Sequence, residues 1–120
     1  MNWIKDAIAA LHSLEGVHKA RVSEASDGRP GRGVFRVYLE LDNAELATPE
    51  LLVSVLERMT GAAEAGLTGG SVECAVRTET ALRQVSPREL IGDRDERGLR
   101  VAGGAVHVTA DWLRRRQGRR

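Results

Sequence analysis

The chain has 120 residues, of which 42% are hydrophobic and 29% charged, and its net charge is +1. This length fits one domain that buries a core without disulfides or metal, and the single cysteine excludes an intrachain disulfide. No apolar run approaches the roughly 18 residues that cross a membrane, and the amphipathic N-terminal segment lacks the apolar centre of a secretion signal. We therefore expect a cytoplasmic protein without a membrane span.

The first expected element is a helix over residues 2–14, followed by Gly16 at the position where helices often end. A strand is expected over 17–25, although its alternation is imperfect. The segment 26–33 is a glycine-rich turn by composition. The apolar positions of the helix recur at helical spacing, and they are Trp3, Ile4, Ala7, Ile8, Leu11 and Leu14.

The clearest strand is expected over residues 34–42. Its alternation places one set of side chains on each face of a sheet. Because this strand follows 17–25 after a short turn, the two should pair antiparallel. The set expected to be buried is Phe35, Val37, Leu39 and Leu41, and the set expected on the opposite face includes Arg36, Tyr38 and Glu40.

A second helix is expected after Thr48, which can cap its N-terminus, with Pro49 at the first helical position. The helix ends near Gly61 or continues to Gly66. A third strand follows over 71–78. The buried positions expected on the helix are Leu51, Leu52, Val55, Leu56 and Met59, and those on the strand are Val72, Cys74 and Val76.

The last third begins with a capping box at 86–89, which favours a short helix. Residues 99–101 and 105–109 alternate around two glycines, which predicts a hairpin or one irregular strand. Thr109 or Asp111 can then cap a terminal turn that carries Trp112. We expect a single domain over residues 1–113 and a fraying arginine-rich tail over 114–120.

The order α-β-β-α-β resembles the ferredoxin-like plait without its first strand. The expected fold is therefore an α+β two-layer sandwich, with two helices on one face of an antiparallel sheet. In a circularly permuted plait (α-β-β-α-β-β), residues 106–108 would supply the missing strand between 34–42 and 71–78. The alternative is a three-stranded sheet with the C-terminal hairpin packed beside it.

The segment LHSLEGVHKARV (11–22) is similar to the start of small plait modules, such as the soluble domains of cation-efflux transporters and the heavy-metal-associated domains. The resemblance implies a fold and no metal function, because the paired cysteines of the heavy-metal-associated family are absent.

We predict no catalytic, cofactor or metal site, and a protein that is not an enzyme. His12, His18 and His107 are scattered, and none has a second ligand at helical or strand spacing. The run 93–98 resembles the start of a calcium loop but lacks its oxygen ligands at the later positions. Cys74 is expected to be an inert buried thiol. The loop 27–33 could hold an anion with its backbone amides, but a hairpin turn is favoured.

The main functional hypothesis is a protein-interaction or regulatory module that forms a homodimer. One face of such a sheet stays open and offers a contact surface, and a free edge of strand 17–25 or 71–78 offers another. The candidate interface residues on the open face are Val34, Arg36, Tyr38, Glu40, Glu73 and Arg77.

The alternative is nucleic-acid binding through residues 98–120. Residues 1–85 hold nine basic and twelve acidic side chains, whereas 86–120 hold nine basic and five acidic ones, and such asymmetry indicates an acidic partner. The segment 98–116 also resembles the wing and closing helix of winged-helix, excisionase-type DNA binders. The candidate contacts are Arg114, Arg115, Arg116, Arg119 and Arg120.

Overall fold

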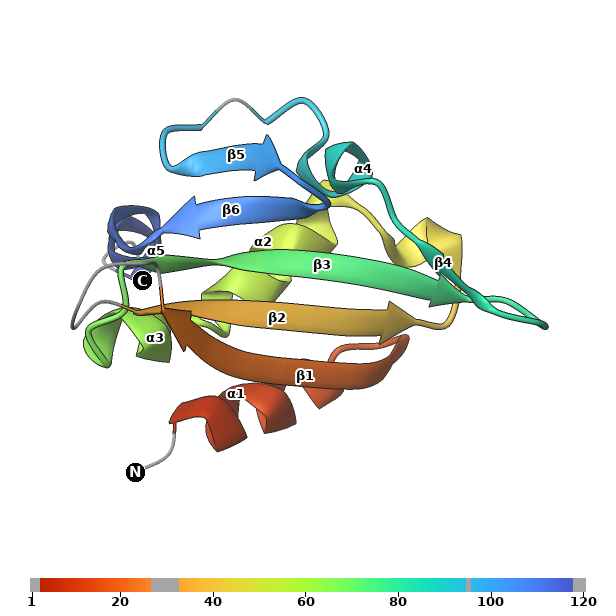
Figure 1. Ribbon diagram of the computed structural model, residues 1–120, viewed down its shortest axis with the longest axis horizontal. Coiled ribbons are helices and arrows are strands. Elements are labelled where there is room, and N and C mark those ends of the chain that lie inside the picture. Colours follow the sequence, from red (N-terminus) through yellow and green to blue (C-terminus); the bar gives the residue numbers. More distant parts are fainter. Residues whose placement is uncertain (1–2, 27–32, 95, 118–120) are drawn as a thin grey trace.

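Five strands lie side by side in one open sheet, in the order β1-β2-β3-β6-β5, and a sixth strand, β4, pairs with β3 (Figure 1). The structure is a computed structural model that describes residues 3–26, 33–94 and 96–117. The strands are β1 (Val17–Ser26), β2 (Gly33–Leu41), β3 (Gly69–Arg77), β4 (Leu82–Gln84), β5 (Leu99–Ala102) and β6 (Ala105–Thr109).

The sheet is mixed. β1 pairs antiparallel with β2, and β6 pairs antiparallel with both β3 and β5. β2 and β3 are parallel neighbours, with Phe35 opposite Gly70 and Leu41 opposite Val76. A parallel pair needs a crossover, and here the chain between the two strands forms η1 (Ala44–Leu46), α2 (Pro49–Glu57) and α3 (Thr60–Glu64).

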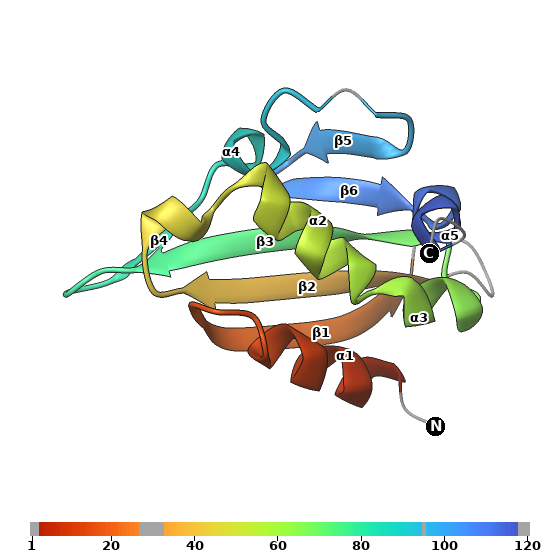
Figure 2. The ribbon, with the colours of Figure 1, turned by 180° about the vertical axis from the view of Figure 1, so that it is seen from behind.

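The helices leave one face of the sheet uncovered. α2 and α3 lie across the back of the sheet, and α1 (Trp3–His12) lies beside β1 on that side (Figure 2). α4 (Pro87–Ile91) lies near β4, and α5 (Ala110–Gln117) lies at the opposite end of the sheet. The view in Figure 1 faces the uncovered side, which no helix crosses. The result is a compact α+β globule with a six-stranded mixed open sheet.

Local sequence signals placed most helices correctly. The Thr48 hydroxyl accepts a hydrogen bond from the Leu51 amide at 3.2 Å, and Pro49 is the first helical residue of α2. Ser86 caps α4 in the same way, through the Arg88 amide. Of the two caps predicted for the last helix, Thr109 and Asp111, the structure shows Thr109 in this role: its hydroxyl accepts a hydrogen bond from the Trp112 amide at 3.2 Å.

The core lies between the sheet and the helices. The predicted row on β2 is buried: Phe35, Leu39 and Leu41 are fully inaccessible and Val37 is 2% exposed. On β3 the inward positions are Gly70, Val72, Cys74 and Val76, and of these the three with side chains belong to the same buried cluster. The helix side chains that close this core without any exposure are Leu11, Leu52, Val55, Leu56, Met59 and Ala62.

Several predictions about the sheet were wrong. The sheet is not wholly antiparallel, and β6 does not separate β2 from β3 but pairs with the far side of β3. The strand expected over 71–78 therefore has neighbours on both sides and no free edge. The C-terminal segment does form a hairpin, but as part of the sheet rather than beside it. The hydrophobic pattern could not show on which side of β3 the strand β6 pairs. The same side chains of β3 and β6 are buried whether β6 lies between β2 and β3 or on the far side of β3.

Candidate functional site

The open face of the sheet contains a broad hollow with a volume of about 800 Å³. It extends over the outward side chains of β1, β2 and β3 to the turn between β5 and β6. Both signs of charge line it. The charged and aromatic side chains are Arg21, Arg36, Tyr38, Glu40, Glu73 and His107, and Leu82 of β4 adds an apolar side chain that is 50% exposed.

A polar row crosses the whole sheet on this face. Strand register places one residue from each of β1, β2, β3, β6 and β5 beside the next, in the order Ser23, Arg36, Ser71, His107 and Arg100. We call this set the cross-strand row. Directly opposed residues in neighbouring strands have Cβ atoms about 5 Å apart. The row therefore joins two guanidinium groups, an imidazole and two hydroxyls into one strip.

Tyr38 lies at the centre of the open face, between Arg36 and Glu40 on the same strand. Across the sheet it is opposite Arg21 on β1 and Glu73 on β3. Partial burial raises the pKa of Tyr38, and the neighbouring Glu40 carboxylate raises this pKa further. The phenol therefore stays neutral at physiological pH, and it presents a ring and a hydroxyl to whatever contacts this face.

The structure brings together five of the six predicted interface residues. Arg36, Tyr38, Glu40 and Glu73 line the broad hollow, and Val34 lines a second, smaller hollow beside it. Arg77 lies apart from both, at the end of β3.

There the Arg77 guanidinium contacts the His18 ring, whose Nδ1 is 4.0 Å from an Asp42 carboxylate oxygen. This local cluster occupies the Arg77 side chain at the end of the sheet.

The predicted nucleic-acid contacts begin in α5, which extends to Gln117, so residues 114–117 are helical rather than frayed. Arg114 pairs with Asp111 at 3.1 Å, and the Arg116 guanidinium lies over the Trp112 ring, 5.3 Å from its centre. Arg119 and Arg120, like the loop residues 27–32, lie outside the described residues.

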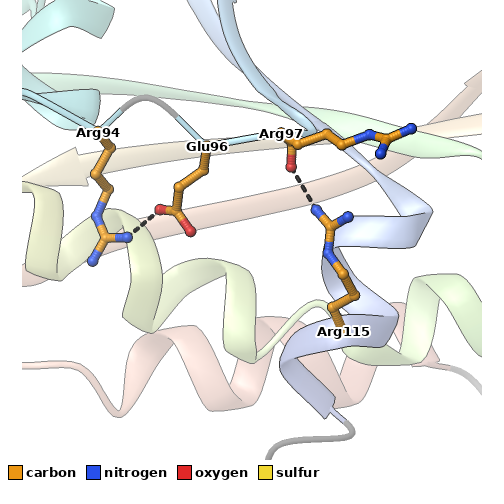
Figure 3. Close-up of polar contacts among 4 residues, drawn as sticks. All are labelled: Arg94, Glu96, Arg97 and Arg115. Carbon is orange, nitrogen blue, oxygen red and sulfur yellow. Dashed lines mark hydrogen bonds and ion pairs between the residues drawn. The ribbon is translucent and has the colours of Figure 1, made fainter.

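Arg115 ties α5 to the charged loop that precedes β5 (Figure 3). Its guanidinium donates to the Arg97 carbonyl at 2.6 Å, and in the same loop Arg94 forms an ion pair with Glu96. Gly98 allows the close approach: its φ is +95°, and a Cβ there would lie 3.0 Å from the Trp112 Cβ. All three described arginines of α5 thus make contacts within the molecule.

No protein-family model matches this chain, and no curated protein or solved structure is significantly similar to it. Its function has to be inferred from its own geometry.

Within residues 3–26, 33–94 and 96–117, no three His, Cys, Asp or Glu side chains gather closely enough to hold a metal ion. No helix in this part of the chain is long and apolar enough to cross a membrane. On the open face Ser71 lies opposite His107, and no hydrogen bond joins these two described side chains.

Burial raises the pKa of the Cys74 thiol to about 12, and the adjacent Glu73 carboxylate contributes in the same direction. The thiolate is the reactive form, and at pH 8 its fraction falls from about a quarter for an ordinary cysteine to about one in ten thousand. We expect the native protein to react with Ellman's reagent at least about 100-fold more slowly than the urea-unfolded protein. The unfolded chain should release one equivalent of thionitrobenzoate, and rapid stoichiometric labelling of the native protein would contradict the burial of this thiol.

The sequence analysis missed four members of the cross-strand row. Ser23, Ser71, Arg100 and His107 are separated by up to 84 positions, and the combined register of the five neighbouring strands brings them together. The available signal was the alternation along each strand, which shows which of its side chains point away from the core. It could not show that the C-terminal hairpin extends the same face.

Proposed function

We propose that this protein is a non-enzymatic interaction module that forms a homodimer through the open face of its sheet. The carrying observation is the symmetric placement of opposite charges about Tyr38: Arg36 lies two residues before it and Glu40 two residues after it on the same face of β2.

This arrangement is self-complementary. A two-fold axis that crosses the strands at Tyr38 would reverse the strand direction of the second copy. Arg36 of each copy would then lie over Glu40 of the other, and the two Tyr38 rings would meet at the axis. An isologous interface requires such a self-complementary patch. On β3, Ser71 and Ala75 lie at the same two levels, and their small side chains permit close approach. Arg21 and Glu73 lie at the level of the axis and would each face their own counterpart, so the charge pairing across the interface is confined to Arg36 and Glu40.

The face is a better candidate than the sheet edges. β1 forms one edge and has an irregularity in its register between Val17 and Lys19, and β5 forms the other edge with only four residues. Bulges and short edge strands are the usual devices that prevent edge pairing.

Nucleic-acid binding through residues 98–120 is the weaker proposal. Arg114 and Arg116 contact side chains of their own helix, and Arg115 donates to a loop carbonyl. A phosphate backbone would have to compete with these contacts.

The expected dimer is weak. The five-stranded face is about 20 Å wide, and its seven paired residues on β2 and β3 give a similar length. Interfaces of this size are at the lower end of those that hold specific complexes, so we expect a dissociation constant in the micromolar range.

Charge reversal provides the test. We expect Arg36→Glu and Glu40→Arg each to weaken the dimer by about tenfold or more, because each variant opposes like charges twice in the symmetric interface. The double variant Arg36→Glu with Glu40→Arg should restore it, because the pair is exchanged and remains complementary. Sedimentation velocity from 5 to 500 µM measures all three.

Arg88→Glu is the matched control, since Arg88 is an exposed arginine on α4 away from the open face. It should leave the association constant unchanged. A wild-type protein that stays monomeric throughout the concentration range, or single variants that associate like the wild type, would refute the proposed interface.

A further inference from the structure

The open face holds a second hollow of about 430 Å³, next to the broad one and on its β5 side. Arg36, Ser71 and His107 belong to both hollows, and Arg100 lines only the smaller one. Gly69 and Gly98 also line it, and because they have no side chains they leave it room. Its volume is in the range of small-molecule sites, which begins at about 300 Å³.

The charge of the smaller hollow differs from that of the broad one. Glu40 and Glu73 line the broad hollow, whereas no carboxylate from the described part of the chain lines the smaller one. Its polar side chains are four members of the cross-strand row, all except Ser23, and two threonines, Thr68 and Thr109. Its apolar wall on the open face is the side chain of Val34. Leu99 and Val108 border the hollow only through their backbone, because their side chains lie in the buried core on the other face of the sheet.

The two arginines flank the hollow from opposite sides. Arg36 on β2 and Arg100 on β5 are three strand spacings apart in the cross-strand row, which is about 14 Å. A ligand over Ser71 and His107 would lie midway, where both long side chains can reach it. Guanidinium groups bind carboxylates and phosphates through paired hydrogen bonds.

The His107 side chain borders both hollows and is held by a contact with the adjacent strand. Its Nε2 donates to the Ala102 carbonyl in the adjacent strand at 3.1 Å. That contact makes Nδ1 the hydrogen-bond acceptor of the neutral ring, so Nδ1 can accept from a donor such as the neighbouring Ser71 hydroxyl but does not itself donate to a phosphate oxygen. An imidazole held in this way beside a serine hydroxyl offers polar contacts between the two positive charges.

We propose that the smaller hollow binds a small organic dianion, a phosphate monoester, with its phosphate between Arg36 and Arg100 and its organic part against Val34. Two guanidinium groups match the nearly double charge of a phosphate monoester at neutral pH. The apolar wall accounts for an organic substituent. Arg36 is shared with the charge pair proposed for the dimer, so a bound phosphate and a second copy compete for its guanidinium, whereas Arg100 and His107 take no part in that pair. The site is therefore tested on the monomer and can exist whether or not the dimer forms.

Phenyl phosphate is the probe, titrated into ¹⁵N-labelled protein at a concentration where sedimentation shows monomer. We expect saturable shifts of the amide signals of Ser71, His107 and Arg100. Phenol, which has the ring without the phosphate, should produce none. Inorganic phosphate should shift the same signals at higher concentration, because it lacks the contact with the apolar wall.

Arg100→Ala should weaken phenyl phosphate binding by about tenfold or more, as expected for the loss of a charge-assisted pair. Arg21→Ala is the matched control, an arginine on the same face that lines only the broad hollow. Equal affinity of Arg100→Ala and wild type, equal effects of both variants, shifts that do not saturate, or equal binding of phenol would each overturn the proposal. Circular dichroism checks that both variants are folded.

Discussion

Replacing Gly70 by alanine is expected to destabilise the protein by about 1–3 kcal/mol, the range for overpacking a filled core. Gly70 faces Phe35 across the parallel pair, and a Cβ at Gly70 would lie 2.4 Å from ring atoms of Phe35. The ring has no room to retreat, because Phe35 is fully buried and packs edge-on against Trp3 at 6.4 Å.

The expected loss of stability is opposite in sign to the usual effect of this substitution in a strand. Where space allows, replacing glycine by alanine in a strand stabilises it by about 0.5–1 kcal/mol, because glycine loses more backbone entropy on folding. A lower urea midpoint with an unchanged m-value would thus report the clash. An equal or higher midpoint would show that the ring can move aside.

Two further variants isolate the cause. Ser71→Ala changes the next residue of the same strand, on the open face, and should shift the urea midpoint little. Combining Gly70→Ala with Phe35→Leu should cost less than the sum of the two single changes, because the smaller side chain makes room for the new methyl group. If the losses in unfolding free energy of the two single variants add up exactly in the double variant, the destabilisation by Gly70→Ala does not come from the contact with Phe35.

The second large effect is expected for Trp112→Ala. Trp112 is 2% exposed and is the largest of the fully buried side chains. Removing a buried aromatic side chain of this size costs about 3–5 kcal/mol, a large part of the stability of a small domain. The stacking surface for Arg116 disappears with it. Urea unfolding monitored by far-ultraviolet circular dichroism measures the loss.

Asp111→Ala is the control beside it. The Asp111 side chain is 81% exposed and pairs only with Arg114 of the same helix. Exposed pairs contribute little, so this variant should unfold close to the wild type. A Trp112→Ala variant as stable as Asp111→Ala would show that α5 is not anchored through the indole.

Short-range signals predicted the local elements well. The β2 alternation identified Phe35 and Leu39 as core, and the cap at Thr48 located the start of α2. The buried face of a strand and the start of a helix depend on residues close together in the sequence. The hydrophobic period determines the first, and capping chemistry determines the second. The three-residue strand β4 was missed, because Leu82 and its two neighbours are exposed and show no burial pattern.

Pairing between distant strands was beyond such signals. Alternation shows that Val72 and Val106 point inward, but it cannot show that they are opposite each other. The parallel contact of β2 with β3 likewise depends on how α2 and α3 return the chain across the sheet. For the same reason the sequence predicted which residues of β2 and β3 lie on the open face. It did not predict that this face continues across β6 and β5 to His107 and Arg100.

The position of β3 has a consequence for synthesis of the chain on the ribosome. One half of this strand, Gly69–Val72, acquires its second neighbour only when β6 has been made, about 35 residues later. Until then the nascent chain presents an unpaired, apolar strand border, which can template aggregation. The C-terminal hairpin therefore acts as a closing element for the sheet, and chains that terminate early should be removed by chaperones and proteases rather than accumulate.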